Sequence, residues 1–197
     1  MPPPQHRSQR VAVVVIDVFS DFRFDGGSRL LRALKLRLPP LENLLAKARR
    51  CGVPVIYVND CLGTWDSNFP RMLHEATNRR GVRPIVERLV PQSGDVVIVK
   101  PRHSAFYGTA LEPVLERLRV SNLVLAGVSS ESCVWMTATD AHTRGFSLVV
   151  PQDTMAGLST RAVRAMLTGL REVIHARTPR TAASVRFRRG LLQSPGK

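Results

Sequence analysis

The sequence predicts a single α/β domain in which a mostly parallel sheet is covered by helices on both faces, a three-layer arrangement. Apolar, β-branched segments alternate with helix-length segments along the chain, and this order is typical of parallel sheets. The first such segment, VAVVVIDV at 11–18, is almost continuously apolar. Such a run is typical of a strand buried on both faces, because a strand with one solvated face alternates polar and apolar residues. A length of 197 residues suits one domain with a sizeable core.

The other elements follow from local signals. Residues 39–52 predict a helix, because prolines open the segment, apolar residues recur at helical spacing and a glycine closes it. Residues 83–90 fit either a helix or irregular structure. Further strands are expected at 53–60, 95–100, 121–128 and 146–153, and further helices at 110–120, 132–145 and 159–175. We expect a flexible N-terminal segment at 1–9, the domain at 10–190 and a tail at 191–197.

The composition excludes several classes of protein. Lys and Arg number 29 against 15 Asp and Glu, a formal net charge of +14. The arginines are scattered without a recognition-helix pattern, so nucleic acid is not expected as a partner. The longest apolar run is far shorter than the ~20 residues of a membrane span, and no signal-peptide pattern opens the chain. Three cysteines without a CxxC pair fit reduced thiols. We therefore expect a cytoplasmic protein that does not associate with membranes.

Polar residues stand at the carboxyl ends of the predicted strands, the edge where parallel sheets bind ligands. Asp17 interrupts the first apolar run, where a carboxylate needs a partner. Asn59 and Asp60 end the second strand, Lys100 ends the third, and Cys133 follows the fourth near the start of a helix. Each alone fits a structural role, but Asp17, Lys100 and Cys133 together indicate a nucleophilic thiol with a base and a cation. We expect the helix terminus and the cation to lower the pKa of this thiol.

Other chemistries lack their sequence signatures. The first strand is not followed by G-x-G-x-x-G, and the sequence contains no G-x-x-x-x-G-K-[ST] loop. GVSSE is not a G-x-S-x-G nucleophile motif, because its last position is Glu131. The five histidines form no close ligand pair, so a zinc site is not expected.

Three segments resemble the isochorismatase-like cysteine hydrolases, a superfamily that includes nicotinamidases and N-carbamoylsarcosine amidases. They are VVVIDVFSDF, VVIVKPRHSAFYGT and GVSSESCVWMTATDAHTRGFSLVVPQD, which stand in the family's order and at similar spacing within residues 10–155. The resemblance implies a parallel sheet of about six strands flanked by helices. It also implies a small-molecule substrate and a homo-oligomeric assembly.

The resemblance places the family's Asp–Lys–Cys triad on Asp17, Lys100 and Cys133. It implies a non-proline cis peptide between Val128 and Ser129, which would aim the amides of Ser129 and Cys133 at one point as an oxyanion hole. In the implied mechanism the carboxylate takes the thiol proton, the thiolate attacks the substrate carbonyl, and the ammonium stabilises the charged pair. The same carboxylate then protonates the leaving amine and activates the water that hydrolyses the thioester.

Departures from the family pattern narrow the expected chemistry. NDCLGTWDSN at 59–68 lacks the histidine that metal-binding nicotinamidases carry, so we expect no metal and no other cofactor, and nicotinamide becomes a less suitable substrate. True isochorismatases cleave a vinyl ether and lack the cysteine, so Cys133 favours hydrolysis of a C–N bond in an amide, carbamoyl or ureido compound. Residues expected to line the pocket are Phe22, Asn59, Trp65, His103, Phe106 and Tyr107. Arg102 is either a selector of anionic substrates or a solvated side chain.

Two alternatives remain open from the sequence. One is a vinyl-ether or ester hydrolase on the same fold, whose turnover would survive replacement of Cys133. The other is a catalytically inactive basic binding module, whose affinity for polyanions would fall steeply with salt.

Overall fold

The computed structural model describes residues 10–61 and 68–194. Within these ranges the main sheet has six strands, and every pairing between them is parallel. They are β1 (Val11–Ile16), β2 (Val55–Asp60), β3 (Val96–Lys100), β4 (Asn122–Val128), β5 (Ser147–Val149) and β6 (Met155–Ala156). The order is β3-β2-β1-β4-β5, with β6 also pairing β4. The predicted fold class is confirmed.

Strand β1 shows why the first apolar run contains no polar position. All six of its residues are buried. Its odd-numbered residues pack into one apolar core, and its even-numbered residues pack into a second core on the opposite face of the sheet. Both faces are therefore dry, and a polar side chain on either face would lose its contact with water.

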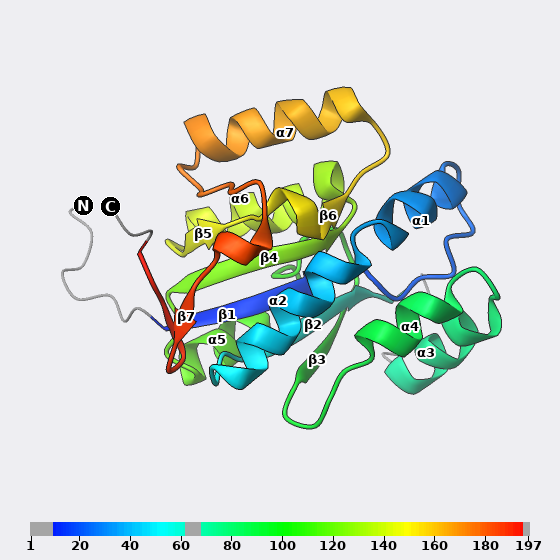
Figure 1. Ribbon diagram of the computed structural model, residues 1–197, viewed down its shortest axis with the longest axis horizontal. Coiled ribbons are helices and arrows are strands. Elements are labelled where there is room, and N and C mark those ends of the chain that lie inside the picture. The colour runs from blue at the N-terminus through cyan, green and yellow to red at the C-terminus, as the bar shows by residue number, and fades with distance from the viewer. Residues whose placement is uncertain (1–9, 62–67, 195–197) are drawn as a thin grey trace.

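Helices cover both faces of the sheet (Figure 1). One face carries α1 (Gly27–Lys35), α2 (Leu38–Arg50), α3 (Phe69–Asn78) and α4 (Arg83–Leu89), and the other carries α5 (Leu111–Arg117), α6 (Trp135–Thr143) and α7 (Thr160–Glu172). Figure 1 shows α2 running across the sheet and α7 lying along its upper side. None of the described helices is long and apolar enough to span a membrane.

Two of these helices were not predicted. Helix α3 has a local start signal, because the side chain of Asn68 accepts a hydrogen bond from the amide of Arg71 and Pro70 lies in the first turn. Helix α1 has no side-chain cap and no acidic residue in its first turn, so its start carries little local signal. Residues 83–90, which fitted either structure, form α4 at Arg83–Leu89.

The predicted strand at 146–153 is wrong in its second half. β5 ends at Val149, and a short 3₁₀ helix (Gln152–Thr154) leads from there into β6. Pro151 precedes that helix and has no N–H to donate to a strand ladder.

Both ends of the predicted domain show differences or limits. Residues 1–9, expected to be flexible, lie outside the described residues. The tail expected from residue 191 begins instead with β8 (Leu191–Leu192), which pairs with β7 (Phe187–Arg188) in a small antiparallel sheet. Leu191 also forms a bridge with Arg10, so this part of the chain is tied to the start of β1.

The parallel register brings the carboxyl ends of the central strands together. Asp60 on β2 pairs with Lys100 on β3, and Ile16 on β1 pairs with Gly127 on β4. A Cβ on Gly127 would lie 2.1 Å from the carbonyl oxygen of Ile16, and φ at this glycine is +116°. Only glycine permits this approach. The end of β4 therefore lies against the end of β1.

Candidate active site

Lys100 is the centre of a buried charged cluster at this edge of the sheet. Its side chain has no solvent exposure, and its Nζ lies 2.9 Å from Asp17 Oδ2 and 3.5 Å from Asp60 Oδ2. The ammonium also donates to the carbonyl of Arg102 at 3.0 Å and lies 3.7 Å from Cys133 Sγ. A buried ammonium is tolerated only with partners of this kind.

Asp17 is held in place by contacts on both carboxylate oxygens. Oδ1 accepts a hydrogen bond from the amide of Asp60 at 2.7 Å, while Oδ2 faces Lys100. The residue has a φ of +53°, so the backbone turns sharply where β1 ends. Only 12% of its side chain is exposed. The carboxylate is therefore fixed with little access to water.

Cys133 lies on a π-helical turn (Ser130–Val134) that joins β4 to α6. The turn begins at Ser129, whose carbonyl accepts hydrogen bonds from the amides of Ser132 and Val134. The peptide bond between Val128 and Ser129 is cis, as the resemblance implied. This turn brings Cys133 to the same edge of the sheet as Asp17 and Lys100.

Burial determines the proton affinities of the cluster. It raises the pKa of Asp17 above its ordinary value, although Lys100 and a hydrogen bond from Cys133 act in the opposite direction. Burial and the charge of Asp17 together raise the pKa of the Cys133 thiol to about 12, because Lys100 only partly offsets them. The expectation of an acidified thiol is therefore wrong, because burial and the neighbouring carboxylate outweigh the cation.

Lys100 stays charged despite its burial. Burial lowers the pKa of its ammonium, but the charges of Asp17, Cys133 and Asp60 raise this pKa by more. The pKa of Lys100 therefore lies above its ordinary value. One positive charge therefore faces a carboxylate and a thiol that compete for a proton. A thiolate beside the carboxylates of Asp17 and Asp60 would add a further negative charge, which suits proton transfer between Asp17 and Cys133 rather than loss of the thiol proton to water.

A cavity of about 580 Å³ opens beside the cluster, lined by Asp17, Ser129 and Cys133. Of the predicted pocket residues, Phe22, Asn59 and His103 line it. Val128 of the cis peptide also lines it, together with residues that sequence reasoning did not single out: Ser20, Asp21, Arg23, Phe24, Leu30, Glu75, Ser132 and Leu158. Glu75 lies on α3 and Leu30 on α1, the two helices that were not predicted. Both cavity residues were missed because no helix was predicted in either segment.

The predicted pocket residues that reach the cavity differ in what they contact. His103 Nδ1 lies 3.7 Å from Cys133 Sγ. Asn59 is buried, and its amide group bonds the backbone nitrogen and oxygen of Phe19 at 3.0 and 2.6 Å. Asn59 therefore fastens the loop after β1 as well as lining the cavity. Phe22 is buried in the same loop, with a φ of +53°.

The structure does not bring Phe106 or Tyr107 to the cavity. The ring of Phe106 packs against Phe146, with the guanidinium of Arg144 4.8 Å from its centroid, and the side chain of Tyr107 is exposed. These residues follow Ser104 and Ala105, which are hydrogen-bonded to Asp140 and Thr137 of α6. Arg102 does not line the cavity either. Trp65 lies outside the described residues.

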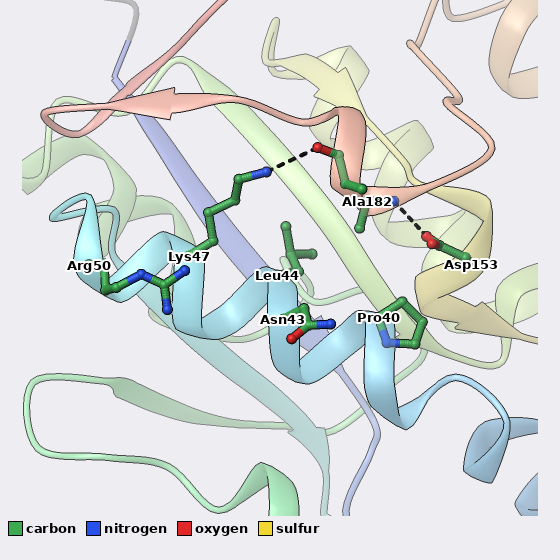
Figure 2. Close-up of a pocket in the computed structure, with 8 residues that line it drawn as sticks. Pro40, Asn43, Leu44, Lys47, Arg50, Asp153 and Ala182 are labelled. Atoms are coloured by element: carbon green, nitrogen blue, oxygen red, sulfur yellow. Dashed lines mark hydrogen bonds between the residues drawn. The ribbon is translucent and has the colours of Figure 1, made fainter.

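Two other cavities are poorer candidates for catalysis. One, of about 330 Å³, lies along α2, and Figure 2 shows two of its lining side chains, Lys47 and Asp153, in hydrogen bonds to the backbone. Lys47 Nζ donates to the carbonyl of Ala183 at 3.1 Å, and Asp153 accepts from the amide of Ala182 at 2.8 Å. The other, of about 680 Å³ beside α7, has no cysteine or histidine in its described lining. In the described ranges, no three His, Cys, Asp or Glu side chains are arranged to hold a metal ion.

Comparisons with known proteins agree with this architecture. The model of the isochorismatase domain family matches residues 11–181. An uncharacterised isochorismatase family protein of Bacillus subtilis, YaaI, is 33% identical over 165 residues, which cover 84% of this chain and 91% of the relative. An N-carbamoylsarcosine amidase of an Arthrobacter species is 30% identical over 158 residues, covering 74% of this chain and 59% of the relative. The crystal structure of a cysteine hydrolase from Pseudomonas syringae superimposes with a TM-score of 0.71 at 26% identity, covering 93% of this chain and 95% of that one.

Proposed function

Because the chain belongs to the isochorismatase family of hydrolases, we propose that it cleaves a C–N bond of a small amide, carbamoyl or ureido compound through a thioester on Cys133. The observation that carries the proposal is the contact of the buried Lys100 with both Asp17 and Cys133, two residues that line the cavity. Carboxylate, thiol and ammonium are the three groups that such a reaction needs as base, nucleophile and counter-charge.

In the first half-reaction Asp17 takes the thiol proton as Cys133 Sγ attacks the carbonyl carbon. The raised pKa of Asp17 makes it a stronger base than an ordinary carboxylate. The thiol, whose pKa is about 12, carries its proton until the attack begins. Transfer and attack are therefore coupled. Lys100 faces both groups, so the negative charge keeps its counter-ion while it moves from oxygen to sulfur.

The tetrahedral oxyanion then needs donors that are already in place. We assign this role to the amide of Ser129, whose nitrogen belongs to the cis peptide, and to the amide of Cys133, which lies within the π-helical turn; both residues line the cavity. Asp17 returns the proton to the leaving nitrogen, the C–N bond breaks, and ammonia or an amine departs. Water then hydrolyses the thioester, which releases the acid product and restores the thiol.

Ammonia release from a panel of small amides, ureas and carbamoyl compounds, including N-carbamoylsarcosine, tests the proposal. The wild type and Cys133→Ala are compared, with Cys51→Ala as control. Cys51 lies at the end of α2 and contacts the carbonyl of Phe187, so it is remote from the cavity lining. The proposal expects release by the wild type and Cys51→Ala only. Turnover that survives in Cys133→Ala would instead support a hydrolase without a cysteine nucleophile.

A further inference from the structure

Glu131 is a charged residue on the turn that carries Cys133, and the chemistry described above gives it no role. It lies two positions before Cys133 on the π-helical turn, at the position where a G-x-S-x-G motif would have its last glycine. Its side chain is half-buried and does not line the active-site cavity. A carboxylate that is partly removed from water in this way needs partners within the protein.

Both oxygens of the Glu131 carboxylate have such partners. Oε1 accepts a hydrogen bond from the amide of Leu158 at 2.6 Å, and Leu158 belongs to the segment between β6 and α7. Oε2 accepts a hydrogen bond from Ser130 Oγ at 3.1 Å, and Ser130 is buried. Hydrogen bonds to a charged acceptor are stronger than those between neutral groups. Glu131 therefore ties the turn of Cys133 to a segment that lies 27 positions further along the chain.

A glycine in that segment lets the carboxylate come close to the backbone. A Cβ added to Gly157, the residue before Leu158, would overlap Glu131 Oε2 and lie 2.5 Å from Ser130 Oγ. It would also lie 2.6 Å from a methyl group of Val163 on α7. A side chain at this position would push the segment away from the turn. The close approach at Gly157 and the hydrogen bond at Leu158 thus show independently that the two parts of the chain fit tightly together.

Leu158 is itself part of the wall of the active-site cavity. It packs against the apolar core on the face of the sheet that α1 covers. One of its methyl groups would lie 2.9 Å from a Cβ added to Gly26, the residue before α1. The partner of Glu131 is therefore held in place on the cavity side. A shift of the turn relative to Leu158 would move the sulfur of Cys133 relative to a substrate in the cavity.

We propose that Glu131 is a positioning residue for the nucleophile, an inference that rests on the function proposed above. Its hydrogen bond to the amide of Leu158 holds the turn against the segment between β6 and α7. This bond fixes Cys133 Sγ relative to Asp17 and to the carbonyl carbon that the sulfur attacks. Glu131 takes no part in proton transfer. A displacement of reacting atoms by about 1 Å can cost about 100-fold in rate, so loss of the bond should slow the attack.

Acylation by p-nitrophenyl acetate measures the placement of the thiol, because each attack by Cys133 releases one coloured nitrophenolate. With the enzyme in excess over the ester, the release reports acylation alone, and Cys133→Ala serves as the blank. Urea unfolding gives the folded fraction, so that each rate constant refers to folded molecules. A residue with a merely structural role would change the folded fraction and leave this rate constant unchanged.

Three substitutions of Glu131 separate its hydrogen bond from its charge. Glu131→Ala removes both, and we expect the rate constant to fall by about 10- to 100-fold. Glu131→Gln keeps an oxygen that accepts from the amide of Leu158, so its rate constant should stay within about threefold of the wild type. Glu131→Asp keeps the charge but withdraws the oxygens by one methylene, and it should be slowed by about tenfold. The last two variants carry the test if Glu131→Ala does not fold.

Ser159→Ala is the matched control. Ser159 adjoins Leu158, and its side chain caps α7 by accepting a hydrogen bond from the amide of Ala162. The control thus loses a hydrogen bond from the same segment, but not the bond to the turn, and its rate constant should match the wild type.

The outcomes separate the positioning role from the proposed function. The role of Glu131 is overturned if Glu131→Ala and Glu131→Asp both stay within about twofold of the wild type, or if Ser159→Ala is slowed as much as they are. It is also overturned if Glu131→Gln is as slow as Glu131→Asp, because the acceptor oxygen would then not matter. A wild type that releases nitrophenolate no faster than Cys133→Ala overturns the covalent mechanism instead, so the two failures are distinguishable.

Discussion

The ammonium of Lys100 lies 2.9 Å from Asp17 Oδ2 at a position that water does not reach. The pair joins two strands of the sheet at the active site, since Asp17 directly follows β1 and Lys100 ends β3, with β2 between them. The same ammonium contacts Cys133 Sγ. A single cation thus stands against two groups that exchange one proton.

Replacing Cys133 with alanine should abolish turnover and leave the fold intact. The thiol is the proposed nucleophile, and loss of a nucleophile typically costs at least about 1,000-fold in rate. Ammonia release together with a thermal melt makes the measurement. Cys51→Ala should retain activity, and a similar loss in both variants would point to damage of the fold rather than to chemistry.

Replacing Asp17 with asparagine should make the thiol more acidic and the enzyme slower. Asp17 raises the pKa of Cys133 through its charge and its hydrogen bond, whereas Lys100 lowers it. Without the carboxylate the pKa should therefore fall below the wild-type value of about 12. Turnover should nevertheless drop by about 100- to 10,000-fold, because the base is gone. The ultraviolet absorbance of the thiolate against pH, with Cys133→Ala as blank, gives the pKa. An unchanged turnover rate would show that another group acts as base.

Lys100→Met should destabilise the protein in a pH-dependent way. Loss of one partner of a buried ion pair costs about 3–5 kcal/mol of unfolding free energy. Asp17 already has a raised pKa in the folded state, and without Lys100 it should rise further. A carboxyl with a raised folded pKa favours the fold while protonated and loses that contribution as pH rises through the folded pKa.

The loss of unfolding free energy in Lys100→Met should therefore be larger at about pH 8 than at about pH 5, where Asp17 is closer to protonation. Urea unfolding at both pH values measures it, with Lys35→Met on α1 as the control. A deficit that is equal at both pH values would contradict the coupling of Lys100 to Asp17.

Gly127→Ala should be among the more destabilising small substitutions in the chain. The added Cβ would meet the carbonyl oxygen of Ile16 at 2.1 Å, and φ of +116° adds backbone strain. Gly52→Ala is the matched control, because φ there is +67° but no atom lies within 4 Å of an added Cβ. The free energy of unfolding should fall by about 1–2 kcal/mol in the control and by clearly more in Gly127→Ala, as measured by urea unfolding. Equal losses would show that the contact between β1 and β4 is not tight.

Much of the fold follows from the sequence because its signals are local. The unbroken apolar run of β1 indicates a strand that is buried on both faces, and the alternation of strands and helices indicates a parallel sheet. Helix α1 has weak local signals, since it begins after Gly26 without a capping side chain. It is held by packing of Leu30, Leu31 and Leu34 into the core, and the helical spacing of these leucines was the signal in the sequence that could have predicted it.

The candidate site was predictable in its residues but not in its electrostatics. Asp17, Lys100 and Cys133 stand out as polar residues at apolar strand ends, so their proximity follows from parallel topology. The direction of the thiol pKa does not follow from sequence. Lys100 does lower it, as expected, but burial and Asp17 raise it more, and both depend on how closely the chain packs around the sulfur.

The most direct test of the central claim is the mass of the protein after an acid quench during its reaction with p-nitrophenyl acetate, followed by peptide mapping. The account predicts one acetyl group on the peptide that contains Cys133, reduced in Asp17→Asn and absent from Cys133→Ala. An acetyl group on another residue, or none in the wild type, would contradict covalent catalysis by Cys133.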